Sequence, residues 1–207
     1  MPGSRLCLDS EGTAPAPLST GVRRHRDRRM RITRIALLAL IGFLSTSCTM
    51  SVHSLFNDGE RSSEPALVGV WESKEQKTTL TLQWLADGKL YSLHTAIEDQ
   101  PAGSAEFTAV LGRVGEHRFL EIHPRSNTGG LYTFWKVELD GDSLTLTPLN
   151  PHWIESMDKA RMRVIEHEPA LGGVTLTAST KELKTFVLKY VDNKAAFSDE
   201  LKFQRKK

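Results

Sequence analysis

Short runs that alternate apolar and polar residues fill the chain between Pro65 and Ala178, and this pattern constrains the fold more than any other feature. In one such run Leu80, Leu82 and Trp84 alternate with threonine and glutamine. A period of two predicts strands with one buried face. The runs that we interpret as strands are residues 67–72, 79–84, 89–95, 106–114, 118–123, 131–139, 143–149, 160–166 and 174–178.

Turn residues separate these runs and predict that neighbouring strands pair antiparallel. Asp87-Gly88 and Asp140-Gly141-Asp142 are hairpin signals, because tight turns require positive φ values. Gly115 and residues 127–130 mark two further turns. The strands therefore form a meander, and closing it as a barrel removes its exposed edges. A two-sheet sandwich is the alternative, and we expect residues 151–158 to form a short helix or turn across one end.

The chain changes period after the last of these strands. Ser179 and Glu182 have the spacing of a helix-capping box. The apolar face of the expected helix consists of Leu183, Phe186, Val187 and Tyr190. We therefore expect a mainly β fold with a barrel domain at residues 65–178 and a helical extension of the same domain at residues 179–207, packed on the barrel. Within it, residues 194–204 form either another helical turn or a closing strand.

A basic and then apolar leader, residues 1–47, precedes this body. Arg31 and Arg34 stand before the uncharged apolar run 35–44, and small residues follow it. This layout is typical of a secretory signal. A membrane-spanning helix needs about twenty apolar residues, so a permanent transmembrane anchor is the less favoured alternative. Translation begins either at Met1 or, if the upstream stretch is a mistaken extension, at Met30.

Charge is divided unevenly between the leader and the body. The formal net charge of +2 combines a leader of +5, with eight arginines and three acidic residues, and a body of −3. Nucleic-acid binding depends on basic side chains that neutralise phosphates. We therefore expect no nucleic-acid partner.

Cys48 directly follows the small residues of the leader, and here the sequence resembles a lipobox, the signal of bacterial lipoproteins. In that signal the cysteine is lipidated on sulfur and becomes the mature N-terminus. Its usual leucine would stand at Ser45, whereas here Leu44 is one residue further back. Because the other cysteine, Cys7, lies in the leader, the body has no internal disulfide. The alternatives are a soluble protein released by an ordinary signal peptidase, and a free thiol at Cys48.

The resemblance implies attachment to a membrane through an N-terminal lipid on Cys48. Thr49 is not the aspartate associated with inner-membrane retention. In a cell with two membranes we therefore expect the outer membrane, with the body facing the periplasm. Residues 48–64 are mostly polar and are expected to form a flexible tether.

No motif in the sequence indicates catalysis or a bound cofactor, and we expect that the chain is not an enzyme. It has neither a Gly-x-Ser-x-Gly motif nor a glycine-rich phosphate loop. Glu121 and His123 share one strand face near His117, but a metal site needs more ligands at fitting spacing. A solvated polar face is the favoured interpretation. Asp140 and Asp142 are explained by a hairpin tip rather than by calcium.

Gly69-Val-Trp71 in the first strand resembles the Gly-x-Trp motif of lipocalin and calycin barrels. The resemblance implies that Trp71 closes the barrel floor and that a basic side chain from a late strand stacks on its ring. The candidates for that side chain are Arg161, Arg163 and Arg205. We interpret Trp84, Trp135 and Trp153 as packing residues. The aromatic candidates for a ligand-lined interior are Tyr91, Phe107, Tyr132 and Phe134.

The chain also resembles a group of bacterial lipoproteins without an assigned activity. The stretches that carry this resemblance are Leu67-Val-Gly-Val-Trp71, Phe119-Leu-Glu-Ile-His-Pro124, Phe134-Trp-Lys-Val137 and Leu176-Thr-Ala-Ser-Thr-Lys-Glu-Leu183. Two functions are therefore expected as alternatives. One is a lipid-anchored envelope protein with a lipocalin-like barrel that binds a small hydrophobic ligand. The other is an envelope protein–protein interaction module whose barrel is filled and holds no ligand.

Overall fold

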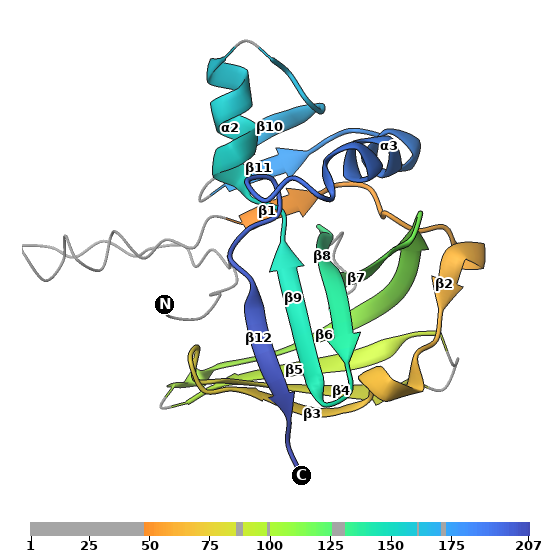
Figure 1. The fold of residues 1–207 in the computed structure, drawn as a ribbon, viewed down its shortest axis with the longest axis vertical. Helices are drawn as coiled ribbons and strands as arrows, with labels where there is room; N and C mark the ends of the chain where they lie inside the picture. Colours follow the sequence, from red (N-terminus) through yellow and green to blue (C-terminus); the bar gives the residue numbers. More distant parts are fainter. Residues whose placement is uncertain (1–47, 86–88, 99, 126–130, 161, 171–172) are drawn as a thin grey trace, which may run out of the picture. The chain divides into compact units, whose positions relative to one another are not determined.

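A computed structural model describes residues 48–85, 89–98, 100–125, 131–160, 162–170 and 173–207 (Figure 1). These residues belong to one unit, Ser47–Lys207. The leader, Asp87-Gly88, residues 127–130 and Arg161 lie outside the described residues, so the predictions made on them stay predictions. In chain order the elements are β1 (Cys48–Ser51), the 3-10 helix η1 (Asp58–Glu60), β2 (Arg61–Ser62), the 3-10 helix η2 (Pro65–Leu67), β3 (Gly69–Ser73), β4 (Thr78–Trp84), β5 (Tyr91–Ile97), β6 (Gln100–Val114), β7 (His117–Pro124), β8 (Thr133–Asp140), β9 (Ser143–Pro148), α2 (Pro151–Lys159), β10 (His167–Ala170), β11 (Gly173–Leu176), α3 (Thr180–Tyr190) and β12 (Leu201–Arg205).

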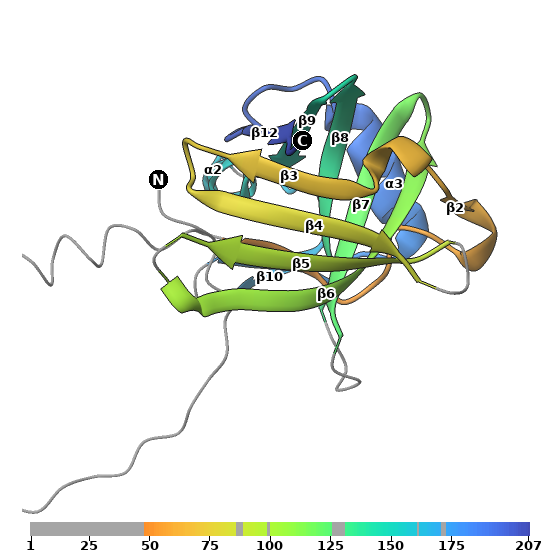
Figure 2. The ribbon, with the colours of Figure 1, turned by 90° about the horizontal axis from the view of Figure 1, so that it is seen from below.

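Eight antiparallel strands form a closed barrel, which confirms the predicted fold and excludes the sandwich. The ring runs β3-β4-β5-β6-β7-β8-β9-β12, and β12 closes it by pairing with both β9 and β3 (Figures 1 and 2). Phe203 stands opposite Leu144, and Arg205 stands opposite Trp71. Of the two alternatives predicted for residues 194–204, the closing strand is therefore the one that the structure shows, at Leu201–Arg205.

Two-residue turns join β8 to β9 and β6 to β7. β8 ends at Asp140, directly opposite Ser143 at the start of β9, and Gly141 between them has a φ of 55°. Gly115 has a φ of 60° in the corresponding turn between β6 and β7. Glycine adopts these left-handed values without steric cost because it has no Cβ. Both glycines therefore mark hairpins as predicted.

The prediction of a strand over residues 160–166 is wrong. The strand of this region is β10, which begins at His167. Of residues 162–166 only Ile165 is buried, at 6% exposure, so the alternating pattern does not correspond to a buried sheet face. β10 and β11 also leave the meander. With β1 they form a separate three-stranded sheet, in which β1 and β11 are parallel.

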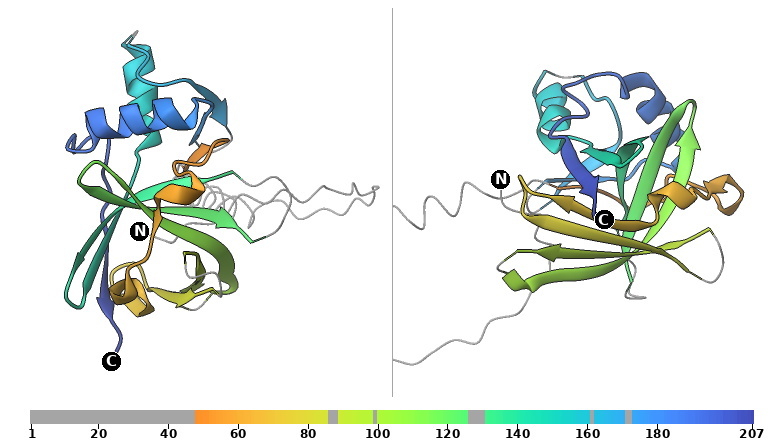
Figure 3. Two further views of the ribbon diagram at one scale, coloured as in Figure 1. Left: turned by 90° about the vertical axis from the view of Figure 1, so that its right-hand side faces the viewer. Right: turned by 60° about the horizontal axis from the view of Figure 1, so that its bottom comes forward.

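Residues 48–62, which we call the N-terminal arm, are folded onto the body, and here the structure differs from the expected flexible tether. β1 pairs with β11, and β2 pairs with β6 outside the ring. Between these strands Leu55 is 0% exposed and Phe56 is 3% exposed. Each such side chain stabilises the arm by roughly 1.5–3 kcal/mol when it is buried. Figure 3 (left) shows the arm descending from the small sheet along the barrel to η2.

The barrel wall separates two hydrophobic cores. The inner core fills the barrel. The outer core lies between the outer faces of β6, β7 and β8 and a cap, which we define as α2, α3 and the three-stranded sheet (Figure 1). β7 contributes to both cores, because Phe119 belongs to the outer core and Leu120 to the inner core. A strand of this kind is buried on both faces.

The helix α3 packs in this cap by the predicted face. The backbone N–H of Ser179 donates to the Glu182 carboxylate over 2.9 Å, which completes the capping box. Leu183, Phe186 and Val187 are buried in the outer core. Neither α3 nor any other helix of the described residues is long and apolar enough to cross a membrane.

We expect Phe186→Ala to lower the free energy of unfolding by about 3–5 kcal/mol, because truncation leaves a cavity beside the Trp153 ring. Leu188→Ala is the matched control, since Leu188 lies on the same helix and is 51% exposed. It should change stability by less than about 0.5 kcal/mol. Thermal denaturation measures both variants. A Phe186→Ala protein that melts with the wild type would show that this face does not dock α3.

Candidate functional site

The floor of the barrel is built around Trp71. Its side chain is 0% exposed, and Nε1 donates a hydrogen bond to the Leu67 carbonyl over 2.9 Å. The guanidinium of Arg205 lies over the indole, 4.1 Å from the ring centroid. Of the three arginines considered for this contact, Arg205 is the one that makes it, whereas Arg163 donates to the backbone of His167.

Arg205 also fastens the chain segment that enters the first barrel strand. Its guanidinium donates to the Val68 carbonyl over 2.8 Å and to the Ala66 carbonyl, and it pairs with Asp142 over 3.3 Å. Gly69 makes room for it, because a Cβ there would stand 2.5 Å from Nη1 of Arg205. The floor therefore joins the two ends of the barrel sequence.

Most side chains of the inner core above this floor are inaccessible to water. A void large enough for a water molecule would expose the side chains that line it. The inner-core residues that are 0% exposed are Leu67, Trp71, Leu82, Tyr91, Ala109, Leu120 and Leu144. No water-sized void therefore touches these seven side chains.

Packing is slightly looser toward the other end of the barrel. There Phe107 is 9% exposed and Ile122 is 7% exposed, while Trp135 and Leu201 are partly buried. These side chains offer apolar surface near the ends of β7 and β9. An apolar ligand would find its first contacts here.

The four aromatic candidates for a ligand-lined interior divide between the two sides of the wall. Tyr91 and Phe107 point into the barrel, whereas Phe134 belongs to the outer core and Tyr132 packs edge-on against His123 at 5.7 Å. The Tyr91 hydroxyl accepts from the backbone N–H of Glu64 over 2.9 Å. Burial raises the pKa of Tyr91 above its ordinary value. Tyr91 therefore stays a neutral packing residue.

Glu121 is a buried carboxylate in the outer core and not part of a solvated face. Its side chain is on the outer face of β7, as predicted, but the N-terminal arm covers it and leaves the residue 2% exposed. The Ser54 hydroxyl donates to the carboxylate over 2.8 Å, and the backbone N–H of Leu55 donates to it as well. Burial raises the pKa of Glu121 above its ordinary value, and the hydrogen bonds from Leu55 and Ser54 oppose that rise.

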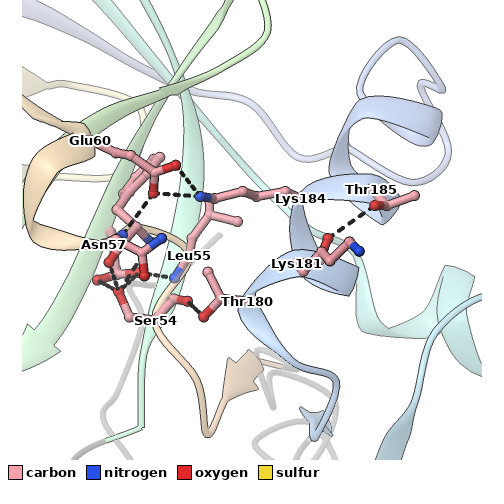
Figure 4. A network of polar contacts seen from close by, with 10 residues as sticks. Ser54, Leu55, Asn57, Glu60, Thr180, Lys181, Lys184 and Thr185 are labelled. Carbon is pink, nitrogen blue, oxygen red and sulfur yellow. Dashed lines mark hydrogen bonds and ion pairs between the residues drawn. The ribbon is translucent and has the colours of Figure 1, made fainter.

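Further polar contacts join the arm to α3 (Figure 4). The Thr180 hydroxyl donates to the Ser54 carbonyl over 2.7 Å. Lys184 pairs with Glu60, and this pairing lowers the pKa of Glu60. Ser54 thus touches both Glu121 and α3. Sequence analysis missed this network, and the one signal for it was the polar residue Glu121 inside an otherwise apolar run.

The histidines near Glu121 do not assemble a metal site. Within the part of the chain that the structure describes, no group of three or more His, Cys, Asp or Glu side chains could hold a metal ion. His123 packs against Tyr132, and His117 lies in a depression of about 250 Å³ between β7 and β8. That depression mixes acidic and basic side chains, including the ion pair Lys136–Glu138 at 2.9 Å.

His167 has partners that its isolated position in the sequence did not indicate. It is 9% exposed, its Nε2 lies 2.8 Å from a carboxylate oxygen of Asp158, and its Nδ1 lies 2.8 Å from the Ile165 carbonyl. Both ring nitrogens therefore lie within hydrogen-bonding distance of an oxygen. The pair joins α2 to β10 and is structural.

Cys48 is the first residue of β1, where its backbone is paired with Gly173. Comparisons of the chain with protein-family models, with curated proteins and with solved structures gave no match.

We expect Trp71→Ala to lower the free energy of unfolding by about 3–5 kcal/mol, because it leaves a cavity at the barrel floor and removes the ring on which the Arg205 guanidinium stacks. Lys202→Ala on the same strand as Arg205 is the control, since its side chain is 67% exposed. Denaturant titration gives both values. A Trp71→Ala protein as stable as the control would contradict the floor's structural role.

Gly112→Ala should destabilise the protein by about 1–3 kcal/mol, because the new Cβ would stand 2.5 Å from the Phe56 ring. Gly59→Ala is the matched control, with no heavy atom within 4 Å of the added carbon. Comparison of the two melting temperatures tests whether the Phe56 ring packs against β6 at Gly112. Equal stabilities would mean that it does not.

Proposed function

We propose that this chain is a lipid-anchored, non-catalytic protein of the bacterial envelope, whose filled barrel supports interaction with another envelope component. The layout of the leader and the position of Cys48 after it support the anchor. The observation that carries the choice between the two functions is the filled interior, with seven inner-core side chains at 0% exposure. A barrel packed in this way acts as a rigid scaffold, and the part of its outer surface that the cap and the N-terminal arm leave uncovered is available for binding.

A small hydrophobic ligand is the second candidate. The partial exposure of Phe107, Ile122, Trp135 and Leu201 at the end opposite the floor favours it. A ligand there would displace or extend the packing of these side chains. Ligand pockets commonly measure about 300–1,000 Å³, so binding would require a substantial opening of this end.

Titration with a fluorescent fatty acid distinguishes the two candidates. The filled barrel predicts no saturable binding by the full chain, and no change in tryptophan emission. Saturable binding at one site, lost in Trp135→Asp and retained in the exposed-surface variant Lys202→Ala, would replace the first candidate by the second.

We expect Cys48→Ala to move the protein from the membrane fraction to the soluble fraction, because the proposed lipid would have no attachment atom. Cys7→Ala is the matched control and should leave fractionation unchanged, since Cys7 lies in the leader. Mass spectrometry of the N-terminal peptide gives an independent measurement. Membrane attachment of Cys48→Ala, with no lipid mass on the wild-type peptide, would refute the anchor. In a cell with two membranes, we propose the periplasmic side of the outer membrane.

A further inference from the structure

The N-terminal arm is attached to the body in a way that leaves the barrel independent of it. The barrel ring contains neither β1 nor β2, and β2 makes only the pairs Arg61–Gly112 and Ser62–Leu111 with β6. β1 lies at one edge of the small sheet. The arm can therefore leave its place without breaking any pairing of the ring.

The contacts that hold the middle of the arm converge on Glu121. The Ser54 hydroxyl and the Leu55 N–H donate to its carboxylate, and the side chains of Leu55 and Phe56 next to them enter the outer core. When the arm is in place, it removes this carboxylate from water. A buried carboxylate is costly unless its hydrogen bonds compensate for lost hydration. The hydrogen bonds from Ser54 and Leu55 to Glu121 position the arm, and their net stabilisation depends on whether the Glu121 carboxyl is charged.

The other charged groups around Glu121 compensate it only in part. Arg61 on β2 contributes an attractive charge, but it also pairs with Asp58 at 2.6 Å. Nε of Arg61 is buried and has no hydrogen-bond partner among the residues that the structure describes. On α3, Lys184 is engaged by Glu60.

Two more titratable groups lie on the neighbouring strand faces. His123 is two residues along the same face of β7 and packs on Tyr132. Lys136 on β8 pairs with Glu138. The contacts of these two side chains are therefore with groups other than the Glu121 carboxylate.

We propose that the N-terminal arm is a latch that opens as one unit while the barrel stays folded, and that Glu121 controls how firmly it closes. Local opening of peripheral segments below the free energy of global unfolding is common in folded proteins. Here the opening restores water to the carboxylate and withdraws two apolar side chains from the outer core.

The direction of the pH dependence follows from the burial of Glu121. The closed arm raises the pKa of this carboxyl, so the closed state holds its proton more tightly than the open state. Closure is therefore most stable below the ordinary pKa of 4.5 and weakens as the pH rises to the raised value. In that window the opening equilibrium increases by up to about tenfold per pH unit, and above it the effect levels off.

Opening would also change the reach of the anchor, and this consequence rests on the proposed lipid at Cys48. Residues 48–62 would span up to about 50 Å when extended. A closed arm holds the body next to the anchored residue, whereas an open arm acts as the spacer. The latch itself does not depend on lipidation.

Hydrogen exchange of the full chain tests the latch. The amides of Val52 and Leu55 report on the arm, and those of Leu82 and Leu144 report on the barrel. After correction for intrinsic rates between about pH 4.5 and about pH 8, we expect the arm amides to exchange through a more frequent opening that grows with pH. Glu121→Gln should abolish the growth, and the control Glu75→Gln, at an exposed turn residue, should retain it.

Ser54→Ala gives a second test in which Glu121 keeps its charge. Loss of the Ser54 hydroxyl should increase arm opening by about tenfold or more, with the pH dependence retained. The latch is overturned if arm and barrel amides exchange through one common opening, if Glu121→Gln keeps the wild-type pH dependence, or if Ser54→Ala leaves opening unchanged. None of these outcomes affects the fractionation of Cys48→Ala, so the latch proposal and the lipid-anchor proposal can be contradicted independently of each other.

Discussion

The pairing of β12 with β3 and β9 is the interaction on which the rest of the structure depends. The strands β3 to β9 form a local meander that remains open until the last strand arrives, after the cap has been traversed. Arg205 at the end of β12 then stacks on Trp71 and binds the carbonyls of Val68 and Ala66. Such a non-local contact must overcome the entropy of loop closure. Phe197, shortly before β12, bridges to Leu149, just after β9, so this contact holds the chain leading into β12 near β9.

The second constraint is that β7 is buried on both faces. Phe119 faces the outer core and Leu120 the inner core, so a charged residue in this strand needs its own hydrogen-bond donors. Ser54 and Leu55 of the arm provide these donors. The position of Glu121 therefore determines that the arm is the segment that covers the outer face of β7. Apolar area alone would not specify this choice, since Leu55 and Phe56 are the two buried apolar side chains among those of the arm that the structure describes.

The parts of the fold that sequence analysis predicted are those in which the apolar residues repeat several times with the same spacing. The strands β3 to β9 and the helix α3 each repeat their pattern long enough to be distinguished, and the Gly-x-Trp resemblance placed Trp71 correctly at the barrel floor. The arm could not be predicted, because Leu55-Phe56 is a single apolar pair in a polar stretch. Glu121 was placed on the correct outward face. The pattern contains no information that a cap and an arm cover that face, since both come from distant parts of the chain.

A filled and edgeless barrel restricts where this molecule can change shape. Movement inside the ring would break pairings or open voids among side chains that are packed as densely as a crystal. The outer core differs, because it is assembled from short peripheral elements and contains a buried carboxylate whose charge favours water. The chain enters the described structure at β1, so any force or constraint applied at Cys48 reaches the arm before it reaches the barrel. The arrangement therefore separates a stiff scaffold from a softer segment at the point where the proposed membrane anchor would act.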